Sequence, residues 1–184
     1  MEMEKVLLRH WTTVNENIPL ADTPEGKLER IKVFKDIDVN NNGTLSINEI
    51  FIVLKDKLAI DHPHLKSSVF KAFDAVRILR KKSSKLNDGD HFITFAEFKR
   101  FLTYMKQYFE YYQMFDIIDS DNSKKIDVYE FEAALPFLKH WGLDVQNVQE
   151  TFENIDDNTS GVITFDEFCY WAIKNSLHIP DEDE

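Results

Sequence analysis

The most constraining feature of this 184-residue sequence is a fourfold spacing: an apolar residue is followed, four positions later, by a glutamate that begins an apolar helix. The four pairs are Leu45 and Glu49, Ile93 and Glu97, Ile126 and Glu130, and Ile163 and Glu167. Such an internal repeat predicts a chain built from four copies of one supersecondary unit.

Two of these glutamates end a twelve-residue segment with the complete pattern of an EF-hand calcium loop. Loop positions 1, 3, 5, 7, 9 and 12 supply the ligands, position 7 through its backbone carbonyl and position 12 through both oxygens of a glutamate. Position 6 is glycine because the chain turns there with a positive φ. The expected ligands are Asp38, Asn40, Asn42, Thr44, Ser46 and Glu49 in hand one, and Asp156, Asn158, Ser160, Val162, Thr164 and Glu167 in hand four.

Hand three departs from the pattern at position 6, where Lys124 replaces glycine. Forcing a residue with a Cβ into the left-handed region costs about 1–2 kcal/mol, which is about a tenfold loss of affinity. However, hand three has four carboxylate ligands where hands one and four have two each, so we expect it to bind an ion. Its expected ligands are Asp119, Asp121, Ser123, Lys125, Asp127 and Glu130.

Hand two has lost its first ligand. Counting back from Glu97 as position 12 places Leu86, which has no ligand oxygen, at position 1. In the other hands a phenylalanine lies four residues before position 1. The same rule applied to Phe73 makes Arg77 position 1 of hand two. The segment from Arg77 to Glu97 is nine residues longer than a normal loop. We expect hand two to be a structural partner of hand one. A non-standard site made of Asp88, Asp90 and Glu97 is the alternative.

The expected fold class is all-α, with four EF-hands in two pairs. The apolar residues at position 8 of paired loops are expected to meet in a short β contact, hand one with hand two and hand three with hand four. Residues 1–22 are predicted to be an N-terminal segment with a short amphipathic helix, residues 23–105 and 106–178 the two EF-hand pairs, and residues 179–184 a disordered acidic tail.

Two further segments each have two interpretations. Phe98–Ile118 is expected to be one long helix whose large apolar surface is covered by the two halves or serves in part as a docking surface. The basic cluster in hand two is either a solvated helix end or a contact for an anionic partner or phospholipid headgroups. This cluster consists of Arg77, Arg80, Lys81, Lys82 and Lys85.

Composition narrows the function classes. Residues 1–92 carry 15 basic and 14 acidic side chains, whereas residues 93–184 carry 7 and 19, so the C-terminal half attracts cations. The single cysteine, Cys169, permits no intrachain disulfide and is typical of a reducing compartment, and no window reaches the length of a membrane span. We therefore expect a cytoplasmic protein. Nothing in the sequence indicates an enzyme or a nucleic-acid partner.

The order of several motifs resembles the calflagins, the flagellar calcium-binding proteins of trypanosomatids. The resemblance runs through about residues 11–173 and includes the lengthened second hand. The motifs are Trp11, Ile18-Pro19, Lys27, Arg30-Ile31, Phe34-Lys35, Ala72-Phe73-Asp74, Phe95-Ala96-Glu97-Phe98, Met114 to Asp119, Ala134-Leu135-Pro136, Trp141-Gly142 and Thr164 to Phe168.

This resemblance implies a flagellar or ciliary calcium sensor whose C-terminal pair carries calcium sites. Calflagins are attached to the flagellar membrane by acylation at a glycine that follows the initiator methionine, and here the second residue is Glu2. We therefore expect no myristoylation and only weak membrane contact.

The functional prediction is a calcium sensor that binds two or three Ca²⁺ ions, with Mg²⁺ as a competitor, and that regulates a protein target. The sequence leaves open the identity of this target and the oligomeric state of the protein. A calcium buffer is one alternative, since only four methionines are present to build an adaptable groove. A calcium-independent subunit of the light-chain type is another.

Overall fold

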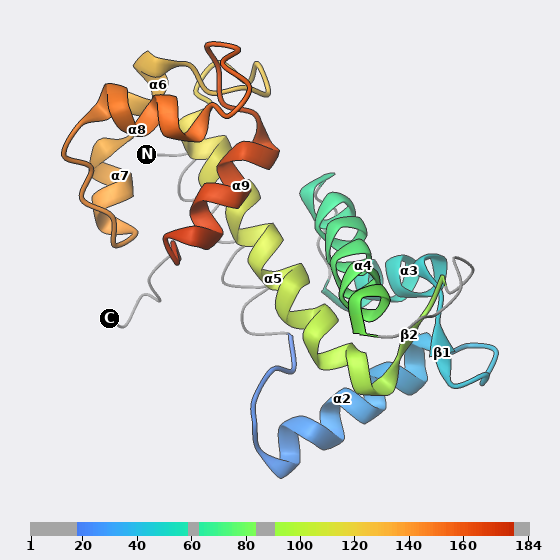
Figure 1. Cartoon of the computed structure of the whole chain (residues 1–184). Helices are drawn as coiled ribbons and strands as arrows, with labels where there is room; N and C mark the ends of the chain where they lie inside the picture. Colours follow the sequence, from blue (N-terminus) through green and yellow to red (C-terminus); the bar gives the residue numbers. More distant parts are fainter. Residues whose placement is uncertain (1–17, 59–62, 84–90, 179–184) are drawn as a thin grey trace. The chain divides into compact units, whose positions relative to one another are not determined.

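The computed structural model describes residues 18–58, 63–83 and 91–178, and the chain forms two compact units, Met1–Phe109 and Glu110–Glu184. The expected amphipathic helix around Trp11, the loop acids Asp88 and Asp90, and the acidic tail lie outside the described residues. The elements labelled in Figure 1 are α2 (Pro24–Ile37), β1 (Thr44–Leu45), α3 (Ile47–Leu58), α4 (Pro63–Ser83), β2 (Ile93–Thr94), α5 (Phe95–Ile118), α6 (Val128–Ala133), α7 (Leu135–His140), α8 (Val148–Ile155) and α9 (Phe165–Lys174).

A threonine followed by a proline, as at Thr23 and Pro24, is a sequence pattern that predicts a helix start, and the first helix of hand one begins there. Thr23 is the N-cap and accepts a hydrogen bond from the backbone of Gly26, and Pro24 occupies the first turn. A Cβ on Gly26 would lie 2.5 Å from the backbone oxygen of Ala21, so the chain entering α2 can approach only because residue 26 has no side chain. The buried Arg30 fixes the same segment by donating to the carbonyls of Pro19 and Ala21.

The first unit pairs hand one with hand two. β1 and β2 form an antiparallel contact in which Leu45 lies opposite Ile93, which confirms the predicted position-8 pairing. Both residues are fully buried, and α3 packs against α2 and α4 (Figure 1). Phe34 makes edge-to-face contacts with Phe95 and Phe98 at centroid distances of 5.4 and 5.3 Å, which joins α2 to the start of α5.

The residues added to hand two lengthen its first helix. α4 continues past Arg77, where the spacing of the other hands would end it, and runs to Ser83. The insertion therefore places additional helical turns, rather than only loop, ahead of β2. The last turns of α4 include Arg77, Arg80, Lys81 and Lys82 of the basic cluster, and Lys85 lies outside the described residues.

The second unit pairs hand three with hand four through a single β-bridge. Ile126 and Ile163 exchange both backbone hydrogen bonds, at 2.9 and 2.8 Å, which is the other predicted position-8 pair. The second helix of hand three is interrupted at Ala134, and α7 restarts with Pro136 in its first turn, where a missing N–H costs no hydrogen bond.

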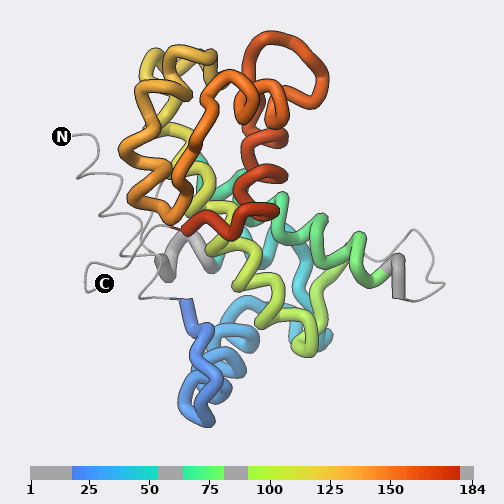
Figure 2. Tube along the Cα trace, turned by 60° about the vertical axis from the view of Figure 1, so that its left-hand side comes forward, coloured from blue at the N-terminus to red at the C-terminus, as the bar shows by residue number. Residues whose placement is uncertain are grey.

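The core of the second unit is aromatic. Phe131 of α6 packs on Phe152 of α8 and Trp171 of α9, and Phe115 at the end of α5 packs on Phe168. Cys169 is buried, as expected for a small apolar side chain. Figure 2 shows the loop of hand four, in orange, extending away from α8 and α9. Residues 157–161 of this loop are exposed, whereas the aromatic side chains of Phe152 and Phe168 on the flanking helices are buried.

The fold class predicted from the repeat is confirmed: the described chain is mostly helical, with EF-hands in two pairs and short β contacts between paired loops. The long helix expected from Phe98 to Ile118 is α5, which begins three residues earlier. The two interpretations of its apolar surface stay predictions. Among the described residues no helix combines the length and the apolar character needed to cross a membrane.

Candidate metal centres

Hands one, three and four hold their position-1 aspartate in the same way. In each, one carboxylate oxygen accepts the backbone N–H of position 5 and the other accepts that of position 6. These distances are 3.0 and 2.9 Å for Asp38, 2.9 and 3.0 Å for Asp119, and 2.9 and 2.8 Å for Asp156. All three aspartates are buried. The three loops therefore wrap around a carboxylate that is already oriented.

Position 6 of all three loops has a left-handed backbone. The φ angle is 79° at Gly43 and 81° at Gly161, and it is 67° at Lys124. A Cβ at either glycine would meet no atom within 4 Å, so the cost of a side chain there is backbone strain rather than a clash. Lys124 accepts this strain, and its ammonium lies 4.0 Å from the carboxylate of Asp116.

The closing glutamates of hands one and four have matching hydrogen bonds. One oxygen of Glu49 accepts the N–H and hydroxyl of Ser46, at 2.9 and 2.7 Å, and one oxygen of Glu167 accepts the same groups of Thr164, at 2.9 and 2.6 Å. The other oxygen accepts the position-3 amide, from Asn40 at 2.9 Å and from Asn158 at 2.7 Å. Positions 3, 9 and 12 thus converge in both hands.

Hand three concentrates negative charge. Ligand oxygens of Asp119, Asp121 and Glu130 lie within 4.8 Å of one another, which among the described residues is the only such group of three. Burial raises the pKa of Asp119 and the nearby charge of Glu130 adds to this, although backbone hydrogen bonds from Lys124 and Ser123 act in the opposite direction. The pKa of Asp121 is lowered, chiefly by the hydrogen bond from the Ser123 backbone. Such a cluster favours a hard cation with oxygen ligands.

Hand two is arranged around an arginine instead. The Nε of Arg80 donates to one oxygen of Glu97 at 2.7 Å and an Nη donates to the other at 2.5 Å. The same Nη donates to the carbonyl of Phe92 at 2.7 Å. Burial by itself would raise the pKa of Glu97, but hydrogen bonds from Arg80 and Thr94 outweigh it, so the pKa lies below the ordinary value.

For Arg80, the interpretation of the basic cluster as a solvated helix end is wrong, because its side chain is only 12% exposed and binds Glu97. Arg77 instead forms an ion pair with Asp74 on its own helix. Sequence reasoning missed the role of Arg80, although one signal was present: a closing glutamate was kept where the first ligand was lost, in a segment rich in cations. The other suggested members of a hand-two site, Asp88 and Asp90, are outside the described residues.

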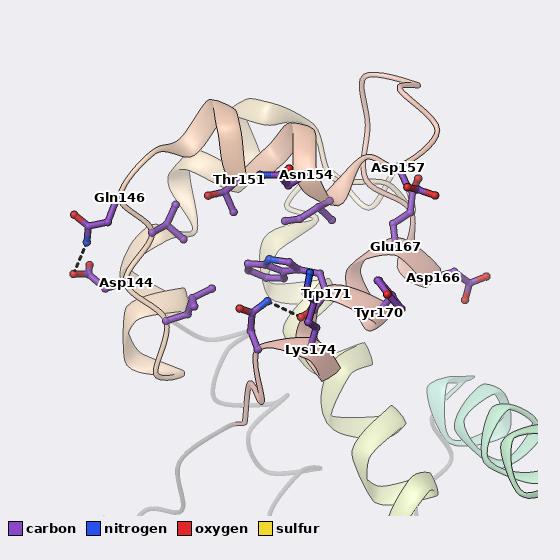
Figure 3. Close-up of a pocket in the computed structure, with 14 residues that line it drawn as sticks. Asp144, Gln146, Thr151, Asn154, Asp157, Asp166, Glu167, Tyr170, Trp171 and Lys174 are labelled. Atoms are coloured by element: carbon purple, nitrogen blue, oxygen red, sulfur yellow. Dashed lines mark hydrogen bonds between the residues drawn. The ribbon is translucent and has the colours of Figure 1, made fainter. Parts of the chain in front are cut away.

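A cavity of about 810 Å³ lies beside hand four, within the second unit (Figure 3). Ile155 and Trp171 contribute apolar surface, and Figure 3 shows Trp171 between Asp144 on one side and Glu167 on the other. Acidic side chains outnumber basic ones around it: the charged lining residues are Asp144, Asp157, Asp166, Glu167 and Lys174. The cavity therefore combines apolar surface with a negative rim that includes the closing glutamate of hand four.

Comparison with known proteins places these features in a family. The FCaBP EF-hand domain family matches residues 14–105, and the EF-hand domain pair matches residues 109–173. The chain belongs to the flagellar calcium-binding protein family. It is 37% identical over 179 residues to flagellar calcium-binding protein TB-1.7G of Trypanosoma brucei brucei, covering 95% of this chain and 78% of that protein.

Two other relatives give the same result. Flagellar calcium-binding protein TB-24 of Trypanosoma brucei brucei is 37% identical over 95% of this chain and 82% of its own length. The flagellar calcium-binding protein of Trypanosoma cruzi is 35% identical over 88% of this chain and 77% of its own length. The resemblance inferred from the sequence motifs is confirmed, and the family is one of EF-hand calcium-binding proteins rather than of enzymes.

Proposed function

We propose that the protein is a flagellar calcium sensor in which hands one, three and four each bind one Ca²⁺ ion. The ligands would be the oxygens predicted at positions 1, 3, 5, 7, 9 and 12 of each loop. The matching position-1 geometry of Asp38, Asp119 and Asp156 supports three sites rather than two. Mg²⁺ would compete, because these are oxygen sites, but it is smaller and demands a tighter octahedral geometry.

The cavity beside hand four is the observation that favours a sensor over a buffer. Glu167 closes the hand-four loop and also lines the cavity, and the next turn of the same helix carries Trp171. Drawing Glu167 onto an ion would therefore move the start of α9 and the cavity together. A buffer needs no such link between its ion and an apolar surface.

The chemistry of the cavity indicates the kind of target. Its acidic rim would attract a positively charged segment, and its apolar surface would take an apolar anchor residue on that segment. We therefore propose a basic amphipathic peptide as the partner. The relatives are flagellar calcium-binding proteins, which supports a flagellar location for this interaction.

Titration with Ca²⁺ and with Mg²⁺ tests the proposal, following tryptophan emission and the binding of a hydrophobic dye. We expect Ca²⁺, and not Mg²⁺, to change both signals. Trp171→Phe should remove most of the emission change, while Trp141→Phe is the matched control because Trp141 is buried in the same unit and does not line the cavity. Ion binding that changes neither signal would contradict a sensor and favour a buffer. Dye binding that is independent of calcium would favour the calcium-independent subunit of the light-chain type.

A further inference from the structure

The oxygens that Arg80 contacts occupy defined positions in the EF-hand loop. With Glu97 as position 12, Phe92 is position 7 and Thr94 is position 9. In an occupied EF-hand the ion binds the backbone carbonyl of position 7 and both carboxylate oxygens of position 12. In hand two, the guanidinium binds the carbonyl of Phe92 and both oxygens of Glu97.

We propose that Arg80 is a built-in cation that replaces the metal ion of hand two. A planar guanidinium has donors spaced to match two carboxylate oxygens, and it keeps its charge at all physiological pH values. The guanidinium carbon Cζ of Arg80 also lies 4.8 Å from the centre of the Phe92 ring, and this cation–π contact stabilises the guanidinium in the same position. The side chains of Arg80 and Glu97 are only 12% and 18% exposed, which protects the pair from solvent screening.

The insertion is what makes this replacement geometrically accessible. If α4 ended near Arg77, as the spacing of the other hands would suggest, residue 80 would belong to the loop. Because α4 runs on to Ser83, Arg80 lies on a helix and reaches across to Glu97, 17 residues later in the chain. The longer α4 is thus what allows Arg80 to contact Glu97.

A consequence follows for hand one. Glu97 also accepts the N–H and hydroxyl of Thr94, at 2.9 and 2.7 Å, and Thr94 pairs with Thr44 across the β contact. Thr44 is position 7 of hand one, whose carbonyl is a proposed ion ligand. Arg80 is therefore a positioning residue: it holds β2 in the geometry of a filled hand, without calcium, and β2 holds β1. This part of the inference rests on the calcium binding proposed for hand one.

The first test measures the affinity of hand one. In a chain that carries Glu130→Gln and Glu167→Gln, hand one is left as the calcium site, and we expect Arg80→Met to weaken calcium binding there by about tenfold, within the usual range of coupling between two sites. Arg77→Met is the matched control, because Arg77 lies on the same helix but pairs with Asp74. Equal affinities in the two variants, both verified as folded by circular dichroism, would overturn the positioning role.

The second test examines the arginine directly in the otherwise unaltered protein. The Nε–H resonance of Arg80, assigned by its loss in Arg80→Met, should be protected from exchange with and without calcium, and Glu97→Gln should abolish the protection. Protection that appears only with calcium, or that survives Glu97→Gln, would overturn the built-in cation. This readout does not depend on ion binding by hand one, so its failure is distinct from failure of the proposed function.

Discussion

Hand one and hand two lie in the same unit and share one β contact, but their closing glutamates have different neighbours. Both Glu49 and Glu97 accept the N–H and hydroxyl of position 9, from Ser46 and Thr94. Beyond that, Glu49 meets the amide of Asn40, whereas Glu97 meets the guanidinium of Arg80. The hydrogen bonds from position 9 are common to both hands, but only the closing glutamate of hand two contacts a cationic side chain.

This difference shows what a hand needs in order to remain a partner. A paired EF-hand requires its closing glutamate in place, its position-8 residue buried and its short strand aligned. Leu45 and Ile93 meet these requirements equally, with both side chains fully buried. A metal ion is one way to neutralise the closing carboxylate, and an arginine from a lengthened helix is another. Hand two therefore can lose its first ligand without losing its structural role.

Replacing the closing glutamates should give the largest change in calcium affinity. Glu49→Gln, Glu130→Gln and Glu167→Gln each remove one charged bidentate ligand, and each should weaken its own site by at least about a hundredfold. Isothermal titration calorimetry should then show one fewer calcium ion per chain in each variant. An unchanged stoichiometry in all three would defeat the assignment of the sites.

Position 6 gives a smaller effect that compares hand three with hand four. Lys124→Gly should relieve the left-handed strain seen at φ 67° and tighten hand three by up to about tenfold, since the strain costs about 1–2 kcal/mol. Gly161→Lys should weaken hand four by a similar factor, because no atom lies close enough to clash with its Cβ. Calcium titrations of the two variants check this. If Gly161→Lys weakens hand four but Lys124→Gly leaves the affinity of hand three unchanged, other contacts in hand three offset the strain at Lys124.

Acid should remove the contribution of the Arg80–Glu97 pair to stability. The pKa of Glu97 is lowered in the folded chain, so its stabilisation is present above the ordinary glutamate pKa of about 4.3 and is lost as the pH falls through the lower folded value. Without calcium, Glu97→Gln should destabilise the chain near neutral pH, and this loss of stability should shrink as the pH falls below the ordinary glutamate pKa and through the lower folded value. Urea unfolding at a series of pH values measures this difference.

The matched control for the acid experiment carries Arg80→Met. In that chain Glu97 has lost its cation, so the pH dependence of the Glu97→Gln effect should largely disappear. A difference in stability between wild type and Glu97→Gln that does not shrink as the pH falls below the ordinary glutamate pKa would contradict the ion pair as its origin.

Most of the fold could be predicted from the sequence because each EF-hand loop is specified by residues that are close together in the chain. The position-8 rule predicted both β contacts, Leu45 with Ile93 and Ile126 with Ile163, and Thr23-Pro24 predicted the start of α2. The left-handed turn at Lys124 also followed from register alone. The helix start and the left-handed turn each depend on residues within one turn or one loop, and each β contact follows from the same position in two paired loops.

What the sequence did not reveal depends on contacts between distant residues. The pairing of Arg80 with Glu97 requires α4 to continue beyond its usual end, and no local pattern at Arg77–Ser83 distinguishes a helix that points a cation inward from a solvated one. The cavity beside Trp171 likewise forms from the segment before α8 together with α8 and α9. Glu167 belongs to the hand-four loop motif, but no motif links it to Trp171 or to the segment before α8.

The calcium stoichiometry of Glu97→Gln beside that of the unaltered protein tests the central claim most directly. If Arg80 takes the place of the ion in hand two, isothermal titration calorimetry will find three calcium ions per chain in both proteins. Four ions in the unaltered protein, with one lost in Glu97→Gln, would show that hand two binds metal and would contradict the account.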